Sequence, residues 1–273
     1  MRGGETDVFD LTDRVVVVTG AFGRLGRQFS VALAHRGARV AALDKAADCS
    51  RAADVFGDEH DRILPVQADV TRRSSLDSAL DVVTTKLGVP HGLVNAAAID
   101  SPPEASAAEN GPFETYPESS WDRVMEVNVK GTLLCCQTIG ARMAAAGRGS
   151  VVNVSSIYGL VSPDQRLYSH RREAGDAFFK PVAYSASKSA LFNLTRYLAT
   201  YWGDRNVRVN TVTFGGVFNQ QDERFVAAYA SRAPIGRMAR ADEYNGAIVF
   251  LLSDASSYMT GSNLVIDGGW TAW

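Results

Sequence analysis

The chain has 273 residues, of which 46% are hydrophobic and 21% are charged, and its formal net charge is -2. This composition is typical of a globular protein with a large core, and it excludes a strongly basic surface for nucleic acid. No apolar stretch reaches the length of a membrane span, and the cysteines and histidines have no metal-ligand spacing. With a polar N-terminus and unpaired cysteines, we expect a cytoplasmic protein that binds a small molecule, with no metal, nucleic acid or membrane as partner.

Short β-branched runs alternate with longer helical patterns along the chain. The valine run at residues 15–18 is apolar throughout, as in a parallel strand that is covered on both faces. We expect strands at residues 15–18, 39–43, 63–67, 92–95, 150–154, 207–212 and 263–266, and helices at 25–35, 74–87, 121–146, 184–202 and 242–252. This alternation predicts a doubly wound α/β sheet with helices on both faces. No linker or repeat divides residues 1–273, so we expect a single domain.

Three segments are expected to form loops on the substrate side. Residues 100–120 contain several prolines and little periodicity, as in loops that surround a site. Residues 157–182 form a longer segment whose basic side chains barely outnumber the acidic ones, so a solvated loop and a substrate-covering loop are both compatible with it. Residues 217–240 complete the group.

A glycine-rich segment follows the first expected strand and opens the first expected helix. Gly20 permits a tight turn, Gly23 leaves room for backbone approach, and Gly26 lets the helix pack on the strand. The amides at the start of the helix, beside Arg24 and Leu25, carry a partial positive charge that attracts a pyrophosphate. Because the segment lies between a strand and a helix, we interpret it as the binding site of a dinucleotide cofactor.

Asp44 ends the second expected strand, about twenty residues after the glycines, where a carboxylate can accept a hydrogen bond from a ribose 2′-hydroxyl. The same carboxylate would repel the 2′-phosphate of NADP. Arg24 and Lys45 argue in the opposite direction, since either could reach that phosphate. We predict a preference for NAD over NADP.

Tyr184 and Lys188 lie one helical turn apart, after the serine pair of Ser155 and Ser156. Residues at this spacing share a helix face, so the ammonium can lie beside the phenol. A free tyrosine has a pKa near ~10 and is a poor base at neutral pH, but a neighbouring cation favours the phenolate. The pair therefore predicts a tyrosine general acid/base in an enzyme that also moves a hydride with a nucleotide cofactor.

Taken in order, the motifs resemble those of the short-chain dehydrogenase/reductase family over residues 11–273. They are Thr19-Gly-x-x-Gly-x-x-Gly26, Asn95-Ala-Ala-Ala98, Asn128-Val-x-Gly131, Ser156, Tyr184-x-x-x-Lys188 and Asp267-Gly-Gly269. The resemblance implies a Rossmann-type three-layer fold with seven parallel strands. It also implies an active site formed by Asn128, Ser156, Tyr184 and Lys188.

Within this resemblance, Tyr184 exchanges a proton with the substrate oxygen, and Ser156 hydrogen-bonds that oxygen. Lys188 lowers the pKa of the tyrosine and binds the nicotinamide ribose, while Asn128 helps to hold a water that links the lysine to solvent. Ser155 is the alternative for the serine role. The cofactor-binding residues implied by the resemblance are Asp69, Val70, Asn95, Ala96, Tyr184, Lys188, Val217 and Asn219.

Some positions depart from the family pattern. Arg24 stands where the single-domain branch usually has its middle glycine, and the glycine spacing matches the extended branch, which includes nucleotide-sugar epimerases and dehydratases. The length of the chain and the ending Asp267-Gly268-Gly269 favour the single-domain branch. Phe214-Gly215-Gly216-Val217 replaces the common Pro-Gly, which alters the expected nicotinamide contacts.

The first interpretation of function is a nicotinamide-dependent oxidoreductase that interconverts a secondary alcohol and a ketone on a polar, sugar-like small molecule. Tyr158, Gln165 and Arg166 follow the serine strand closely enough to contact such a substrate, and their alternative role is to shape the loop. The C-terminal tail looks like that of a subgroup from sugar-modification clusters, including nonulosonic-acid pathways.

Two other functions remain open. A nucleotide-sugar epimerase or dehydratase that uses NAD transiently is compatible with the glycine spacing, and a non-catalytic dinucleotide sensor would keep the fold alone. For assembly, the expected helices at 121–146 and 184–202 are apolar on more than one face, and family members commonly pair through them. We expect a homotetramer or homodimer, and the alternative is extra burial within one monomer.

Overall fold

The structure is a computed structural model, and it describes residues 7–100 and 107–273. At its centre is a seven-stranded sheet in the order β3-β2-β1-β4-β5-β6-β7, in which neighbouring strands are parallel. The strands are β1 (Val15–Thr19), β2 (Arg39–Asp44), β3 (Ile63–Gln67), β4 (Gly92–Asn95), β5 (Gly149–Ser156), β6 (Val207–Phe214) and β7 (Asn263–Ile266). The prediction of a Rossmann-type sheet with seven parallel strands is confirmed. The strand order reverses between β1 and β4, where such sheets open a crevice at their carboxyl ends.

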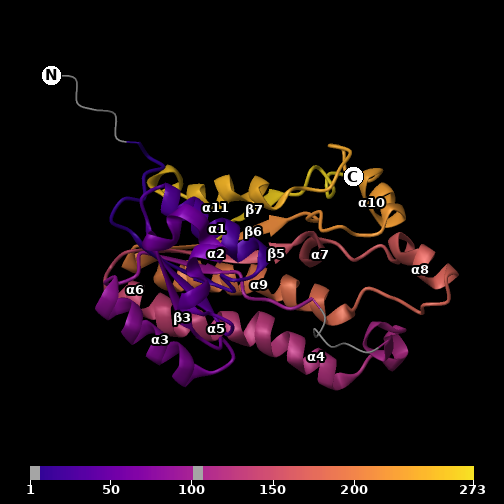
Figure 1. Ribbon diagram of the computed structural model, residues 1–273, viewed down its shortest axis with the longest axis horizontal. Coiled ribbons are helices and arrows are strands. Elements are labelled where there is room, and N and C mark those ends of the chain that lie inside the picture. The colour runs from indigo at the N-terminus through magenta and orange to yellow at the C-terminus, as the bar shows by residue number, and fades with distance from the viewer. Residues whose placement is uncertain (1–6, 101–106) are drawn as a thin grey trace.

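Helices cover both faces of the sheet (Figure 1). One face carries α1 (Arg24–His35) and α11 (Asn245–Leu252), and the other carries α3 (Arg73–Lys86) and α9 (Val182–Trp202). Other α-helices of the described residues are α2 (Ala52–Phe56), α4 (Glu118–Met125), α5 (Thr132–Cys135), α6 (Ala141–Ala145), α7 (Ile157–Leu160), α8 (Ser169–Glu173) and α10 (Glu223–Ala230). Within this described part, no helix is both long enough and apolar enough to cross a membrane.

The valines of β1 divide between two hydrophobic cores, one on each face of the sheet. Val16 and Val18 pack with the helices of the first face, and Val15 and Val17 pack with those of the second. The core on the first face contains Phe29, Leu33 and Ile248. The core on the second face contains Leu76, Ile139 and Trp202. Because side chains alternate along a strand, a strand covered on both faces must be apolar at every position.

The helix expected at residues 121–146 begins earlier and is not a uniform α-helix. It runs from α4 through a π-helical turn (Glu126–Gly131), α5 and a second π-helical turn (Cys136–Gly140) into α6. Single π-turns inside α-helices are uncommon and occur frequently at functional sites. Asn128 lies in the first of these turns.

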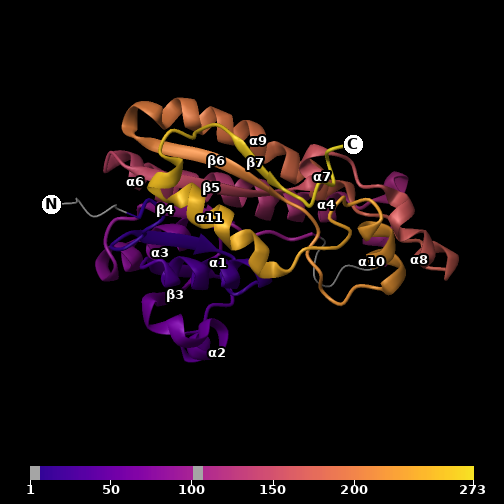
Figure 2. The same cartoon turned by 90° about the horizontal axis from the view of Figure 1, so that it is seen from above.

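Short helices extend the molecule beyond the carboxyl ends of the strands. Figures 1 and 2 show α8 and α10 at this end, with α7 between them and the sheet. These helices belong to the expected loop segments 157–182 and 217–240, and side chains of α7 and α10 take part in a third hydrophobic cluster. Part of the remaining expected segment, residues 101–106, lies outside the described residues.

Candidate active site

The turn between β1 and α1 is too tight to hold side chains at its glycines. Gly20 has a φ of +66°, and a Cβ on it would lie 2.8 Å from the Cα of Ala97. A Cβ on Gly26 would lie 2.1 Å from the carbonyl oxygen of Gly20, and one on Gly23 would lie 3.1 Å from the same oxygen. Backbone therefore forms this wall, and the amides at the N-terminus of α1 remain accessible to an anionic ligand.

A pocket of about 530 Å³ lies against this turn. The predicted cofactor residues that line it are Gly20, Gly23, Arg24, Leu25, Gly26, Asp44, Asp69, Val70 and Ala96. Leu25, Ala96 and Ala98 also line a second cavity, of about 910 Å³, so the two spaces adjoin. A long ligand can therefore extend from the glycine turn into the larger cavity.

Two carboxylates at the carboxyl ends of β2 and β3 are fixed by backbone amides. Asp44 accepts hydrogen bonds from the amides of Phe22 (3.1 Å) and Ala46 (2.9 Å), which ties the end of β2 to the glycine turn. Asp69 accepts from the amide (2.9 Å) and hydroxyl (2.7 Å) of Thr71. Partial burial acts to raise the pKa of Asp69, but these hydrogen bonds outweigh it and the net pKa is lowered. Both groups therefore face the pocket as oriented acceptors.

Arg24 holds the segment after β6 against the glycine turn. Its guanidinium donates to the carbonyl oxygen of Phe218 (3.1 Å) and to the side-chain oxygen of Asn219. Asn219 is exposed and lines neither cavity, and Arg24 occupies its side-chain oxygen, so its contact with the cofactor stays a prediction. Val217 lines the larger cavity, as predicted.

Asn95 has a structural position instead of the predicted cofactor contact. It is buried and lines neither cavity, and its amide donates to the side-chain oxygen of Asn153 on β5 (2.8 Å). Asn153 in turn donates to Thr195 of α9 (2.8 Å). The asparagine therefore links β4 to β5 beneath the site, and its neighbour Ala96 forms the wall of both cavities.

Ser156 and Tyr184 meet in the larger cavity, where they share a side-chain hydrogen bond. Ser156 is the last residue of β5, and its hydroxyl also accepts from the amide of Tyr158 (3.2 Å). The hydroxyl of Ser155 points elsewhere, since it donates to the carbonyl oxygen of Lys188 (2.9 Å) and is buried. Both serines line the larger cavity, but only the hydroxyl of Ser156 hydrogen-bonds Tyr184.

Lys188 lies beneath the tyrosine and is held by the backbone of β5. Its ammonium donates to the carbonyl oxygen of Val154 (2.9 Å) and lies 5.7 Å from the ring centre of Tyr184. Burial lowers the pKa of the lysine from 10.5 to about 8, with Asp100 acting in the opposite direction. The lysine is therefore close to its titration range near neutral pH.

The proton affinity of Tyr184 differs from the simple expectation of a lysine-lowered pKa. Burial raises the pKa of the phenol above its ordinary value, the charge of Asp100 acts in the same direction, and the hydrogen bond with Ser156 only partly opposes them. Removal from water is therefore the main influence on the pKa of the phenol in the protein itself. In this state Tyr184 holds its proton, as a general acid must before it donates.

The side chain of Asn128 is linked to the site through the backbone of Ile99 and the hydroxyl of Ser187. Its side-chain oxygen accepts from the amide of Ile99 (2.8 Å), and its amide donates to the carbonyl oxygen of Ile99 (2.9 Å) and to the hydroxyl of Ser187 (2.9 Å). Ser187 donates to the carbonyl oxygen of Tyr184 (2.7 Å). Asn128 thus joins the strand-end loop after β4 to the helical turn that carries the tyrosine, although it lines neither cavity.

Aromatic side chains form much of the wall of the larger cavity beyond Tyr184. Tyr168 packs on Phe178 and Phe225, with ring centres 5.0 Å and 5.3 Å apart, and hydrogen-bonds Tyr158. Tyr229 closes the far side, where its hydroxyl accepts from the amide of Gly216 (2.6 Å). Aromatic faces suit the C–H surfaces of a carbon skeleton, while the phenols offer hydrogen bonds.

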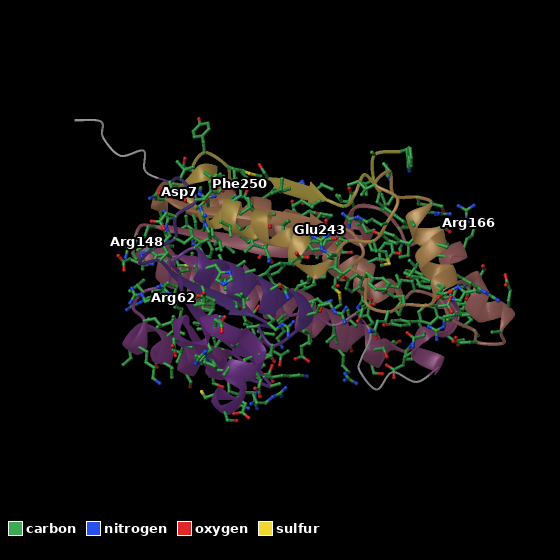
Figure 3. The ribbon with its side chains drawn as sticks, turned by 45° about the horizontal axis from the view of Figure 1, so that its top comes forward. Asp7, Arg62, Arg148, Arg166, Glu243 and Phe250 are labelled. Atoms are coloured by element: carbon green, nitrogen blue, oxygen red, sulfur yellow. The ribbon has the colours of Figure 1, made fainter. Side chains whose placement is uncertain are left out.

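Of the three predicted substrate residues, only Tyr158 lines this cavity. Arg166 instead forms an ion pair with Asp164, and 82% of its side chain is exposed. Figure 3 shows Arg166 at the edge of the molecule, pointing away from it. Gln165 uses its amide to hold the backbone of Lys180, with hydrogen bonds of 2.9 Å and 3.1 Å. A substrate contact stays a prediction for Gln165 and Arg166, whose side chains hold the segment around the cavity in this structure.

A family model described as enoyl-(acyl carrier protein) reductase matches residues 20–271. A solved structure of a short-chain type dehydrogenase/reductase from Mycobacterium marinum superposes with a TM-score of 0.83 at 30% identity, covering 98% of each chain. The chain belongs to the short-chain dehydrogenase/reductase family. It is therefore an oxidoreductase, as predicted.

Other members of this short-chain dehydrogenase/reductase family resemble the chain over nearly its whole length. It is 35% identical to the D-threitol dehydrogenase of Mycolicibacterium smegmatis, over 96% of this chain and 95% of the relative. It is 31% identical to the NAD-dependent glycerol dehydrogenase of Listeria innocua, over 99% and 98%. A structure of a gluconate 5-dehydrogenase from Burkholderia cenocepacia, in complex with NADP and tartrate, gives a TM-score of 0.83 at 25% identity and 98% coverage of both chains.

The residues present fit the nicotinamide dinucleotide that short-chain dehydrogenases use. The side-chain-free turn at Gly20 and Gly26 leaves the helix amides open to phosphates, and Asp44 offers an acceptor at the end of β2. Tyr184 and Lys188 line the larger cavity, which shares Leu25, Ala96 and Ala98 with the smaller pocket. No cluster of histidine, cysteine and acidic side chains suited to a metal ion occurs in the described part of the chain.

Several residues of this short-chain dehydrogenase site have no sequence signal that identifies them. Lys180 and Asp100 form an ion pair inside the larger cavity, yet they are far apart in the sequence and belong to none of the family motifs. Ser187 lies within the tyrosine–lysine segment, where its sequence pattern is that of an ordinary helix residue. Only its position directly before Lys188, on the face of α9 that packs inward, could have drawn attention to it.

Proposed function

We propose that this chain catalyses the NAD-dependent interconversion of a secondary alcohol and a ketone on a polyol or sugar-like small molecule. The observation that carries the proposal is that Ser156, Tyr184 and Lys188 line a cavity that adjoins the dinucleotide pocket. The resemblance to dehydrogenases named for threitol and glycerol supports a substrate with several hydroxyl groups. Tyr158 and Asp100 supply polar groups on the substrate side of Tyr184.

The protein's part in the reaction is to hold the reacting oxygen and to move its proton. During oxidation, the substrate hydroxyl gives its proton to the phenolic oxygen of Tyr184, and Ser156 hydrogen-bonds the same substrate oxygen as the carbonyl forms. During reduction, the phenol returns the proton to the alkoxide oxygen. The nicotinamide, when bound, accepts or supplies the hydride. Lys188, anchored on Val154, keeps a cation beneath the phenol as charge develops.

Asn128 and Ser187 position the general acid/base. Their hydrogen bonds connect Ile99, in the loop after β4, to the backbone carbonyl of Tyr184. Since both side chains are buried, the helical turn that carries the tyrosine is fixed relative to the sheet. We retain the family's water-holding role for Asn128 as a proposal.

NAD is the cofactor we propose, with Asp44 as the discriminating residue. Its carboxylate lines the smaller pocket with an orientation fixed by the amides of Phe22 and Ala46. A 2′-phosphate there would face a negative charge, although Lys45 and Arg24 also line the pocket. We further propose a single domain in a cytoplasmic protein that assembles as a homotetramer or homodimer.

The proposal is tested by assaying a panel of polyols and aldonates, including D-threitol and glycerol, with NAD and with NADP. We expect turnover of a polyol, a higher kcat/KM with NAD, and loss of that preference in Asp44→Ala. Tyr184→Phe should lower kcat by roughly 10²–10⁴-fold, because it removes the proton carrier. Its cofactor binding, followed by fluorescence, is the control and should persist.

Unchanged turnover in Tyr184→Phe would contradict the tyrosine mechanism. A product isomer that forms with no net change in the absorbance of reduced nicotinamide would instead indicate an epimerase. Clear preference for NADP in the parent protein would contradict the role given to Asp44.

A further inference from the structure

Lys180 is a second lysine at the active site. Its ammonium lies 5.1 Å from the ring centre of Tyr184 and 5.9 Å from that of Tyr158, and it forms an ion pair with Asp100. Only 12% of the lysine side chain is exposed, while 52% of the aspartate side chain is. A charge is therefore held largely out of water, on the substrate side of the general acid/base.

Side chains of the segment between β5 and α9 hold the backbone of this lysine in place. The amide group of Gln165 accepts from the backbone amide of Lys180 (2.9 Å) and donates to its carbonyl oxygen (3.1 Å). Arg172 then braces the arrangement, because its guanidinium donates to the carbonyl oxygens of Gln165 (2.8 Å) and Phe178 (3.0 Å). Both backbone polar groups of Lys180, its N–H and its C=O, are thus hydrogen-bonded, which fixes the position of the residue.

The partner of Lys180 acts directly on the tyrosines of the cavity. The negative charge of Asp100 raises the pKa of Tyr184, and it does the same to Tyr158 and Tyr168. In the described residues, the titratable and charged groups that face Tyr184 are Lys188 of the same helix, Tyr158 of α7, Tyr168 at the end of the 3-10 helix Gln165–Tyr168, Lys180 before α9, and Asp100 after β4. Asp100 is the anion in this set, and Lys180 is the cation paired with it.

We propose that Lys180 is a positioning residue for proton transfer, and that its ion pair with Asp100 neutralises a carboxylate that would otherwise hold the proton on Tyr184. The proposal rests on the proposed function of Tyr184 as the general acid/base. Without the ammonium, the carboxylate is an uncompensated negative charge beside the phenol, and it favours the protonated form. Without the carboxylate, the ammonium instead favours the phenolate.

The first test is the pH dependence of kcat/KM for the oxidation of D-threitol, or of whichever panel polyol is turned over. In Lys180→Met, which keeps the length and apolar stem of the side chain, the acidic limb should move to higher pH by on the order of one unit. In Asp100→Asn it should move to lower pH, and the double variant should return toward the parent. Lys180→Arg should restore the parent profile, and Lys86→Met, on an exposed position of α3, should leave it unchanged.

A second readout does not depend on the substrate. Tyrosine labelled with ¹³C at Cζ gives a resonance for Tyr184 that is identified by its absence in Tyr184→Phe. This resonance should begin to titrate at lower pH in Asp100→Asn than in the parent, and at higher pH in Lys180→Met. If no panel compound is turned over, the proposed function fails while this titration still decides the role of Lys180. Resonances and pH profiles that stay in place in both variants, or move in the same direction, would overturn the proposal.

Discussion

Lys188 is an unfavourable group for this fold to bury. Only 4% of the residue is exposed, and its ammonium donates to the carbonyl oxygen of Val154. Within the described residues no carboxylate lies at ion-pair distance from it, and burial lowers its pKa to about 8. A cation without a paired anion destabilises a protein interior. Burial of Lys188 therefore lowers the stability of the folded state, at the position where the proposed mechanism needs a charge.

We predict that Lys188→Met stabilises the fold while abolishing turnover. The lysine has a folded-state pKa of about 8 against its ordinary value of 10.5, so at pH 7 the unfolded chain holds this proton more strongly than the folded chain does. The free energy of unfolding should therefore be higher in Lys188→Met, by on the order of 1–3 kcal/mol. Urea titrations at pH 7 measure the difference.

The two pKa values of Lys188 also determine how that difference in stability depends on pH. Between the folded value of about 8 and the unfolded value of 10.5, the unfolded lysine keeps its proton and the folded one has released it, so the parent gains stability as the pH rises. The excess free energy of unfolding of Lys188→Met over the parent should be close to its full size at pH 7. It should shrink as the pH rises through this window. A difference that stays constant with pH would show that packing, and not charge burial, separates the two proteins.

At the site, motif residues could be predicted from the sequence and the residues that surround them could not. Ser156, Tyr184 and Lys188 carry a pattern of side-chain chemistry at fixed spacing, and the fold brings them into one cavity. Lys180 and Asp100 meet only in space, so nothing in their local sequence marks the pair. Gln165 and Arg166 do not line the cavity, because sequence proximity to the serine strand does not say which way a side chain points.

At the scale of elements, the seven strands could be predicted, but the carboxyl ends of β1, β2, β5 and β6 could not. Apolar runs mark where a strand is buried, whereas pairing continues through polar residues. On β5 and β6 the parallel register extends to Ser155 opposite Thr213 and Ser156 opposite Phe214, beyond the expected ends at residues 154 and 212. That extension matters for function, because it places Ser156 on a rigid strand end.

Short helices escape prediction for a different reason. Helix α10 has only 8 residues, too few to show a clear period, and its stability comes from particular contacts. Asp222 caps its N-terminus by accepting from the amide of Arg224 (2.8 Å), and Tyr229 joins it to the backbone after β6. Such tertiary and capping interactions depend on the rest of the fold, so local pattern alone does not reveal the element.

Two helical glycines provide a matched prediction. A Cβ on Gly26 would lie 2.1 Å from the carbonyl oxygen of Gly20 and 2.8 Å from the Cα of Ala21, so Gly26→Ala must displace α1 from β1. Gly246 lies on α11, where a Cβ would have no neighbouring atom within 4 Å, so Gly246→Ala should stabilise the protein by about 0.5–1 kcal/mol. Thermal unfolding should therefore shift in opposite directions in the two variants.

The cofactor gives Gly26→Ala a second measurement. Because α1 carries the amides that face the pocket, its displacement should also remove the thermal protection that NAD gives to the parent protein. Gly246→Ala should keep that protection in full. An alanine at position 26 that leaves both stability and NAD protection intact would mean that the helix and turn adjust without changing the cofactor site.

For the whole molecule, one helical layer has apolar side chains left exposed to solvent. Helices α9 and α4 pack side by side on the same face of the sheet, as Figure 1 shows. Tyr197 and Tyr201, one turn apart on α9, are 62% and 54% exposed and stack with ring centres 5.9 Å apart. Trp121 of α4 and Leu133 of α5 are also exposed. Exposed apolar surface such as the stacked tyrosine pair is typical of contact between protein chains.

We therefore predict that replacing both exposed tyrosines, in Tyr197→Arg with Tyr201→Arg, lowers the molar mass measured by light scattering after gel filtration. Arginines on this face place like charges opposite each other when two copies meet around a two-fold axis, which opposes association. Tyr258→Arg is the matched control, because this fully exposed tyrosine lies on the loop before β7 and not on α9. A parent protein that is already monomeric at assay concentration would refute the homotetramer or homodimer. An unchanged molar mass in the double variant would show that the interface between chains lies on another face of the protein.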